Sequence, residues 1–332
     1  MSHSHTNDVA TPGATIPRPS PLHGRRVLVI AAHPDDEILF AGAQLSHCRM
    51  LTIVHLTDGA TSRAIAKSQG FRTRRQYAEA RKQELTAALE AGTIEAQCRC
   101  LGYRDTYSCL SMSAATRTLS ELISTERPDV VLTHAYEGGH IDHDTAAFVA
   151  HSAVQLSNIR PELWEMACYH KRNGRRFTHL FPDAENDHSW TITLTPDERE
   201  AKQRMLECFR TQQFIINTFP KDIETLRPAP EHDFTTAPFT GPLAYETNDT
   251  GCEGALWRLL TLSRGQQLSS GTGRTHLSAN AVQLLMWLTL KSAAFRRDHP
   301  SIGTPYERML LRLSGFFVKQ HPGSGSTAHT DV

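Results

Sequence analysis

The sequence predicts an α/β protein with a Rossmann-like sheet, mainly parallel, with helices on both faces and a helical C-terminal extension. The first observation behind this fold class is that apolar, β-branched runs alternate with helix-like runs from residue 25 to about residue 155. Such alternation is typical of βαβ units, whose strands lie parallel in one sheet. The second is that the apolar runs are continuous, as in strands buried on both faces. Beyond residue 250 the patterns are helical.

The first half of the chain is expected to supply three strands, at residues 27–32, 51–56 and 130–133. A helix is expected to begin near Asp35, because the acidic residues there suit the positive end of a helix dipole. Two more helices are expected at about 74–91 and 113–125, where apolar residues recur at helical spacing.

In the second half, the sheet is expected to continue at residues 163–169 and 191–194. The dipeptide Asn173-Gly174, flanked by basic residues, indicates the tip of a hairpin. Thr195 and Glu198 form a capping box with Pro196 at the first helical position, which predicts a helix to about Gln212. Residues 217–250 contain many Pro and Thr and are interpreted as loop. Further helices are expected at residues 253–262, 278–295 and 305–318.

The composition excludes several classes of protein. Hydrophobic residues make up 39% of the 332 residues, which is enough for a buried core. Lys plus Arg (35) equals Asp plus Glu (35), and a net charge of zero argues against a nucleic-acid binder. The seven Cys are scattered, which argues against a disulfide framework and favours a reducing compartment. No transmembrane run or signal peptide is recognisable, so a cytoplasmic location is expected.

The domain organisation follows from these patterns. Residues 1–23 are rich in Pro, Ser, Thr and His and are predicted to form a disordered tail, in which His3 and His5 could bind metal adventitiously. The main domain is predicted over 24–250 and the helical extension over 251–320. A second disordered tail is predicted at 321–332.

Two polar clusters follow predicted strands at their carboxyl ends, where ligands bind in open α/β sheets. Residues 32–37 (AHPDDE) come after the first strand, and residues 137–144 (EGGHIDHD) follow the strand at 130–133. Each cluster alone is more often a turn with a helix cap than a metal site. Together they would gather many ionisable groups at one edge, which is costly unless a cation offsets their charge. The His and Asp residues are a natural zinc ligand set, and three protein ligands would leave a position for water.

The two motifs resemble those of the PIG-L (LmbE-like) family of metal-dependent N-acetylglucosaminyl deacetylases. The resemblance extends to Thr57-Asp58-Gly59, to the helix around Arg81 and to Leu101-Gly102-Tyr103-Arg104-Asp105, and spans roughly residues 25–155. It implies that the predicted domain 24–250 is a deacetylase domain.

The resemblance also implies roles for individual residues. His33, Asp36 and His143 match the metal ligands of the family. Asp35 matches the general base that takes a proton from the metal-activated water. His140 matches the imidazole that stabilises the oxyanion or protonates the departing amine, and Asp142 matches the carboxylate that orients it. Arg81 and Asp105 match positions that contact the sugar, although a solvated helix face and a turn cap explain them equally well.

The sequence departs from the family pattern at three positions. Ile141 stands where Pro is usual, which changes the stiffness of the loop rather than its ligands. Gly138 and Gly139 stand where some relatives have a Tyr with an acid or gating role, and Tyr136 and Tyr245 are candidates to replace it.

The sequence therefore predicts a zinc-dependent hydrolase that removes the N-acetyl group from an N-acetylglucosamine-type amino sugar and releases acetate; Fe²⁺ or another divalent ion is the alternative cofactor. The substrate would be a small-molecule or lipid-linked amino sugar, and homo-oligomerisation is left open. Two other functions compete: an amidase acting on another sugar-conjugate amide, and a metal-bearing binding protein without turnover.

Overall fold

A computed structural model describes residues 20–183, 188–247, 253–270, 283–284 and 286–290. Outside these residues lie residues 1–19 of the first predicted tail, the second predicted tail, the helix predicted at 305–318 and most of the helix predicted at 278–295. Residues 20–23, which the tail prediction included, are described, and Leu22 is fully buried. None of the described helices is both long enough and apolar enough to cross a membrane.

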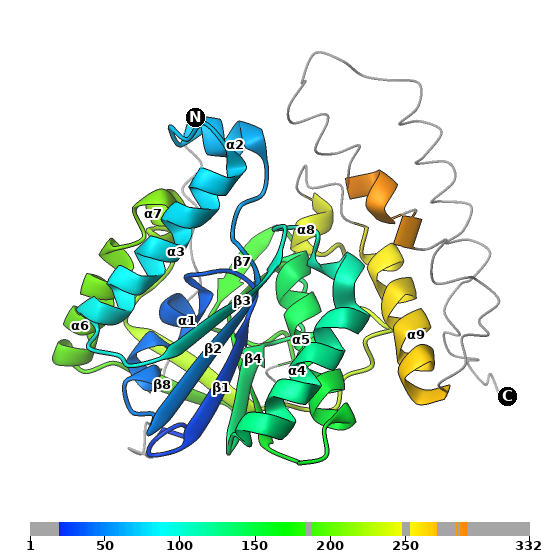
Figure 1. Ribbon diagram of the computed structural model, residues 1–332, viewed down its shortest axis with the longest axis horizontal. Helices are drawn as coiled ribbons and strands as arrows, with labels where there is room; N and C mark the ends of the chain where they lie inside the picture. The colour runs from blue at the N-terminus through cyan, green and yellow to red at the C-terminus, as the bar shows by residue number, and fades with distance from the viewer. Residues whose placement is uncertain (1–19, 184–187, 248–252, 271–282, 285, 291–332) are drawn as a thin grey trace, which may run out of the picture.

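A seven-stranded sheet forms the centre of the described chain, in the order β3-β2-β1-β4-β5-β9-β8 (Figure 1). Five neighbouring strands are parallel, and β9 and β8 complete the sheet through antiparallel pairs, so the prediction of a mainly parallel sheet is confirmed. The strands are β1 (Arg26–Ala31), β2 (Met50–Thr57), β3 (Gln97–Tyr103), β4 (Val130–His134), β5 (Glu162–Met166), β8 (Trp190–Thr193) and β9 (Ile223–Pro228).

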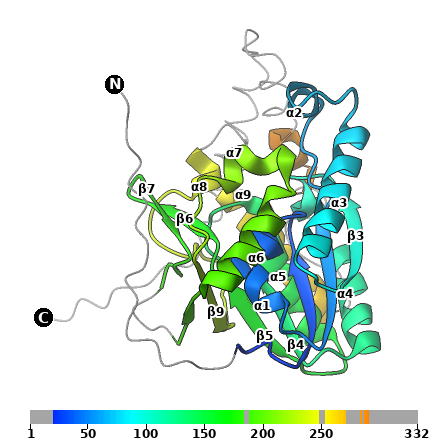
Figure 2. The ribbon, with the colours of Figure 1, turned by 90° about the vertical axis from the view of Figure 1, so that its left-hand side faces the viewer.

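Helices cover both faces of the sheet, as predicted (Figures 1 and 2). One face carries α1 (Asp36–Leu45), α3 (Arg74–Ala91) and α6 (Pro196–Glu207); the other carries α4 (Met112–Glu126), α5 (Ile141–Leu156) and α9 (Gly254–Ser270). The short helices are α2 (Arg63–Ser68), α7 (Gln213–Ile216), α8 (Ala244–Thr247) and the 3₁₀ turns Ser108–Ser111 and Arg210–Gln212.

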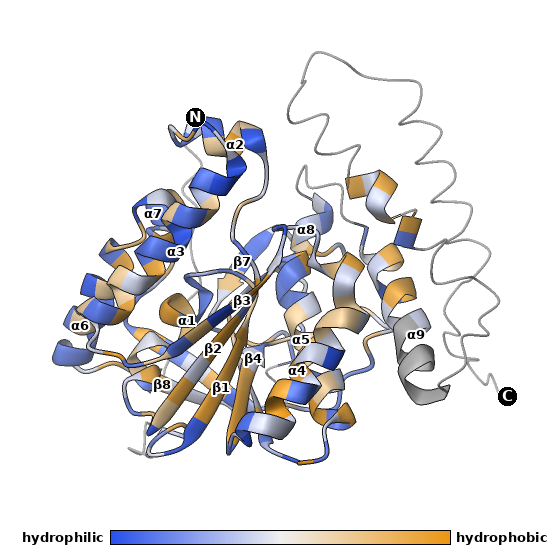
Figure 3. Ribbon diagram, viewed as in Figure 1, coloured by the Kyte–Doolittle hydropathy of each residue, from blue (hydrophilic) through white to orange (hydrophobic). Residues whose placement is uncertain are grey.

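The apolar character of the central strands explains this layering. β1, β2 and β4 are the most hydrophobic ribbons in the sheet (Figure 3), and alternate residues along them enter two separate cores. In β1, for example, Leu28 and Ile30 face α4 and α5, whereas Val27 and Val29 face α1 and α3. Trp257 of α9 lies fully buried in the core on the α4–α5 side.

Several predicted boundaries differ from the observed ones. The predicted strand 163–169 ends at Met166, and the chain then forms a separate hairpin of β6 (Tyr169–Arg172) and β7 (Arg175–Thr178). The tip of this hairpin is Asn173-Gly174 as predicted, and both residues have positive φ (52° and 78°). The hairpin lies to one side of the main sheet (Figure 2).

The helix that begins at the Thr195 capping box ends at Glu207 rather than Gln212. The chain leaves the helix there because Phe209 is fully buried in the core and Thr211 bonds to Glu84. The interpretation of 217–250 as loop is wrong for Ile223–Pro228, which forms β9 inside the sheet.

The order of the strands places the two sequence motifs together. β2 and β3 extend the sheet on one side of β1, whereas β4 and β5 extend it on the other. The carboxyl ends of β1 and β4 therefore flank the point where the winding direction reverses, which is where α/β sheets form a crevice for ligands.

Candidate metal centre

The loop after β1 carries the first group of site residues. His33 and Asp35 follow the strand directly, and α1 begins at Asp36. Asp35 has a φ of 148°, a conformation that a residue with a side chain rarely adopts. Strained backbone of this kind persists where the surrounding contacts fix it, often at functional sites.

The loop after β4 carries the second group and ends at His140, the N-cap residue of α5. Gly139 precedes it, and a Cβ there would collide with the backbone carbonyl of Tyr169. Gly138 has a φ of +68°, which also favours glycine. The two glycines thus allow the loop to pass close to the β6 strand and present His140 at the sheet edge.

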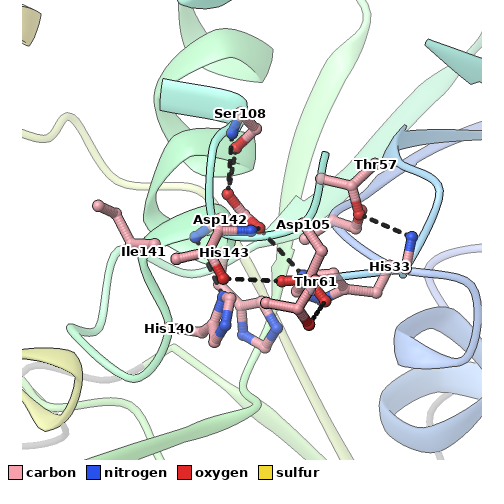
Figure 4. A network of polar contacts seen from close by, with 12 residues as sticks. His33, Thr57, Thr61, Asp105, Ser108, His140, Ile141, Asp142 and His143 are labelled. Carbon is pink, nitrogen blue, oxygen red and sulfur yellow. Dashed lines mark hydrogen bonds and ion pairs between the residues drawn. The ribbon is translucent and has the colours of Figure 1, made fainter. Parts of the chain in front are cut away.

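Three imidazoles from these loops converge. His33, His140 and His143 can each offer a nitrogen within 4.8 Å of the others, and the close view shows their rings grouped below Asp105 and Asp142 (Figure 4). Asp36 joins two of them, because its Oδ2 lies 3.1 Å from His33 Nδ1 and its Oδ1 lies 3.3 Å from His143 Nε2. The structure therefore brings His33, Asp36 and His143 together.

This donor set fits a divalent metal ion. All three side chains are buried, and imidazole nitrogen with carboxylate oxygen is a preferred combination for zinc. His143 Nδ1 is buried and has no hydrogen-bond partner among the described residues. A buried imidazole nitrogen without a partner is costly unless it binds something.

His140 occupies a different position in the group. Its Nδ1 accepts a hydrogen bond of 3.2 Å from the backbone N–H of Asp142. The neutral ring must then carry its proton on Nε2, since only one nitrogen of neutral imidazole accepts. An Nε2–H donor cannot ligate a metal through that atom, and this separates His140 from His33 and His143.

The Asp142 carboxylate is held by the loop after β3. Its Oδ1 accepts from the Ser108 hydroxyl at 2.5 Å and from the Ser108 backbone N–H at 3.2 Å, and its Oδ2 accepts from Thr106 N at 2.5 Å. The same Oδ2 lies 3.1 Å from His33 Nε2. The carboxylate therefore contacts His33, whereas its residue reaches His140 through the backbone. That Asp142 orients His140 stays a prediction. The observed hydrogen bond to His140 comes from the backbone N–H of Asp142 and not from its carboxylate.

The two predicted substrate contacts lie in different settings. Asp105 Oδ1 is 3.6 Å from His33 Nε2, beside the ligand group. Arg81 is only 2% exposed; its Nη2 lies 3.1 Å from Asp35 Oδ1 and donates to Pro34 O at 2.8 Å. Arg81 thus positions the Asp35 carboxylate, and a contact of either residue with a sugar stays a prediction.

The electrostatics of the group are strongly perturbed. Burial raises the pKa of Asp35 to about 7, although the Arg81 guanidinium opposes this shift and Asp36 adds to it. Burial lowers the pKa of His140 to about 4, with the charge of His33 in the same direction. Burial opposes the charged form of His33 as well, but Asp105 and Asp36 outweigh it and raise its pKa well above the ordinary value. Groups perturbed in this way cluster at functional sites.

Sequence reasoning missed His134, the last residue of β4. Its Nε2 accepts from Ala32 N at 3.0 Å and lies 3.4 Å from Asp36 Oδ2, and its ring stacks on His143 with centroids 4.1 Å apart. The sequence signal that could have found His134 is its position directly after the predicted strand 130–133. The buried pair of His55 and Glu37, 3.0 Å apart, was also missed, because nothing in the sequence relates two residues on β2 and α1.

The two tyrosines considered as replacements have other partners. Tyr136 donates to Thr236 O at 2.7 Å, and Tyr245 donates to Asp144 Oδ2 at 3.0 Å. Both are buried. These contacts fix the segment around α8 against the loop that carries His140.

Comparison with known proteins finds a similarity to one family. The model of the PIG-L family, described as GlcNAc-PI de-N-acetylase, matches residues 28–154. A 1D-myo-inositol 2-acetamido-2-deoxy-alpha-D-glucopyranoside deacetylase of Catenulispora acidiphila is 29% identical over 190 residues, which cover 48% of this chain and 58% of that protein. The corresponding deacetylase of Corynebacterium jeikeium is 30% identical over 166 residues, which cover 39% of this chain and 50% of that protein. The chain thus spans little more than half the length of these relatives.

One solved structure supports the fold. The crystal structure of a triple mutant of a deacetylase in the teicoplanin biosynthetic pathway superposes with a TM-score of 0.50 at 19% identity, over 63% of this chain and 99% of that one. The matched segment includes β1, β4 and both motifs that carry the ligand group. Over residues 28–154, the chain is therefore similar to the PIG-L family.

Proposed function

We propose that this chain is a metal-dependent N-deacetylase that releases acetate from an N-acetylglucosamine-type amino sugar. The description of the family and the names of the two deacetylases support this reaction. The observation that carries the proposal is the arrangement of a buried carboxylate, Asp35, and an Nε2-protonated imidazole, His140, around His33, Asp36 and His143. A binding protein would need ligands, but no proton acceptor and donor beside them.

His33, Asp36 and His143 would hold the ion, which we propose to be Zn²⁺. Bound there, a divalent ion supplies a Lewis acid for the acetamide carbonyl and lowers the pKa of water. Asp35 takes up the proton of the attacking water. Arg81 engages Oδ1 of Asp35, and none of the described residues hydrogen-bonds Oδ2, which is therefore the oxygen that accepts the proton.

His140 acts on the acetamide carbonyl, whereas Asp35 acts on the attacking water. The Nε2–H of His140 donates a hydrogen bond to the carbonyl oxygen as negative charge develops there, and the proton held by Asp35 is then transferred to the nitrogen of the departing amine. The hydrogen bond from Asp142 N to Nδ1 keeps the ring in the tautomer that can donate. His140 lies at the N-terminus of α5, where the helix dipole also favours the oxyanion.

The test is acetate release from a panel of N-acetylated amino sugars: simple glycosides, inositol glycosides and lipid-linked forms, with matched conjugates bearing longer acyl groups. We expect acetate from at least one N-acetylated member and slower cleavage of the longer acyl groups. Cleavage restricted to non-acetyl amides would favour the amidase. Binding of a sugar to the metal-loaded protein without cleavage of any member would favour the non-catalytic protein.

A further inference from the structure

A second group of metal-binding side chains lies outside the candidate centre. His151 on α5, Glu165 on β5 and His232, after β9, each offer a ligand atom within 4.8 Å of the others. Glu165 Oε1 lies 3.3 Å from His151 Nε2 and 2.6 Å from His232 Nε2. The two imidazole rings are 5.1 Å apart between centroids. Two imidazoles thus point the same nitrogen at one carboxylate oxygen.

The carboxylate is fixed in place by its other oxygen. Arg227, directly opposite Glu165 in the β5–β9 pair, donates from Nε to Oε2 at 3.1 Å. Glu165 is fully buried, and the arginine therefore leaves Oε1 aimed at the two histidines. Partners of this kind orient the ligands of metal sites and set their affinity.

The charge of the surroundings suits a cation. The other end of Arg227 pairs with Asp183 at 2.6 Å, so its single positive charge is shared between two carboxylates. Glu231 lies next to His232 and lines the same pocket. With neutral histidines, the group carries more negative than positive charge, and a bound cation offsets the difference.

The group is also accessible. A surface pocket of about 570 Å³ is lined by both His151 and His232. The two histidine side chains are 11% and 12% exposed. A metal could therefore enter from the pocket and keep water as a further ligand.

We propose that His151 Nε2, His232 Nε2 and Glu165 Oε1 form a second site, distinct from the candidate centre, for a divalent transition-metal ion such as Zn²⁺. Two imidazoles and one carboxylate are a zinc donor set, and magnesium or calcium would prefer oxygen ligands throughout. The ion would join α5, β5 and the segment that begins after β9. Phe234 of that segment packs against Tyr136 and Phe148, so the ion would fasten the segment to the body of the domain.

The experiment counts bound zinc in the full chain by equilibrium dialysis and elemental analysis. All proteins carry His3→Gln and His5→Gln to remove adventitious binding by the tail, and His33→Ala with His143→Ala to disable the candidate centre. We expect one zinc ion per chain to remain in this background. Adding His151→Gln and His232→Gln should remove it.

The matched control is His47→Gln in the same background. His47 lies 3.5 Å from Glu198 but belongs to no group of three potential metal ligands among the described residues, so its loss should leave the zinc count unchanged. A parallel readout is thermal unfolding, because an ion bound only by the folded state raises the Tm. Zinc should raise the Tm of the background protein and of His47→Gln, but not that of His151→Gln with His232→Gln.

Glutamine keeps a polar group at both positions, and His232→Gln alone, on a segment outside the sheet, serves if the double variant fails to fold. Zinc that persists in the His232 variant, or a background protein that holds no zinc, would overturn the second site. The zinc count of the background protein does not depend on the candidate centre, because that protein lacks His33 and His143. Failure of the candidate centre to bind zinc in a chain that keeps both residues would therefore leave the second site standing, and the two assignments are tested separately.

Discussion

At the scale of single residues, carboxylates lie on both sides of the His33 ring in the candidate centre. Its Nδ1 lies 3.1 Å from Asp36 and its Nε2 lies 3.1 Å from Asp142. Whichever nitrogen binds the metal, a carboxylate remains on the other side to orient the ring and increase its basicity. The Asp142 carboxylate therefore acts on a ligand, a role that its place in the second motif does not reveal.

We predict that Asp142→Asn weakens metal binding by about 10- to 100-fold, which is typical for the loss of such a partner. The amide keeps the size of the side chain but has a single accepting oxygen, so either Ser108, or Thr106 and His33, face an NH2 group instead of an acceptor. A metal titration monitored by calorimetry measures the change. Unaltered affinity together with lower turnover would instead assign Asp142 to His140 alone.

Substitution of Asp35 tests metal binding and proton transfer separately. Asp35→Asn should retain the metal, because the proposed ligands are His33, Asp36 and His143. Turnover should fall by about 10²-fold or more, since the amide cannot accept the proton. Elemental analysis and rate measurements on the same preparation check both parts, and loss of the metal would mean that Asp35 is itself a ligand.

At the scale of secondary-structure elements, a buried ion pair joins α6, β9 and α1. Lys202 Nζ lies 2.7 Å from Glu224 Oε1, and both side chains are fully buried. Glu224 also accepts from the backbone N–H groups of Ala43 and Gln44 at 2.9 and 3.2 Å. Lys202 therefore offsets the negative charge that Glu224 of β9 carries in the interior.

Lys202→Met should lower the free energy of unfolding by about 3–5 kcal/mol, because it leaves the Glu224 charge buried without its partner. Lys202→Met combined with Glu224→Met should recover much of that loss. Urea denaturation of the two variants and the parent protein provides the comparison. A double variant less stable than Lys202→Met would show that the backbone contacts of Glu224 matter more than the charge.

These charges also explain why β9 could not be predicted. Its sequence, IETLRP, places Glu224 and Arg227 among apolar residues and gives no strand signal. Both are buried because distant residues, Lys202 and Glu165, neutralise them. By contrast, the helix at 74–91 and the capping box at Thr195 depend on nearby residues alone and were predicted to within a residue at their starts.

At the scale of the whole molecule, Glu165 links folding to pH. The hydrogen bonds from His151 and His232 and the charge of Arg227 outweigh the effect of burial and lower the pKa of Glu165 to about 2. A carboxyl group with a lowered pKa in the folded state stabilises that state above its ordinary pKa of 4.5. This stabilisation is lost as the pH falls from about 4.5 towards 2.

We therefore predict that the metal-free protein loses about 3 kcal/mol of stability through Glu165 over that range, and that Glu165→Gln removes this part of the pH dependence. The variant should also be less stable at pH 7. Urea denaturation at several pH values in the presence of a chelator measures both effects. Curves for parent and variant that stay parallel below pH 4.5 would contradict the role of Glu165.

The sequence predicted that the two motifs meet, but not all of the contacts between their side chains. Two motifs at the carboxyl ends of strands imply a shared edge through the geometry of parallel sheets, and β1 and β4 are indeed neighbours. The support of Asp142 by Ser108 and Thr106, and of Asp35 by Arg81, depends on how loops and helices pack in three dimensions. The spacing of residues along the chain carries no trace of those contacts.

We propose that the buried His–Asp group is the centre of a metal-dependent deacetylase. The most direct measurement is acetate release from the preferred N-acetylated amino sugar by chelator-treated protein before and after zinc is added, with His33→Ala and His143→Ala variants in parallel. We predict that chelation abolishes release, that zinc restores it in the parent protein, and that zinc fails to restore it in either variant. Acetate release that survives chelation, or that zinc restores equally in both variants, would contradict the claim.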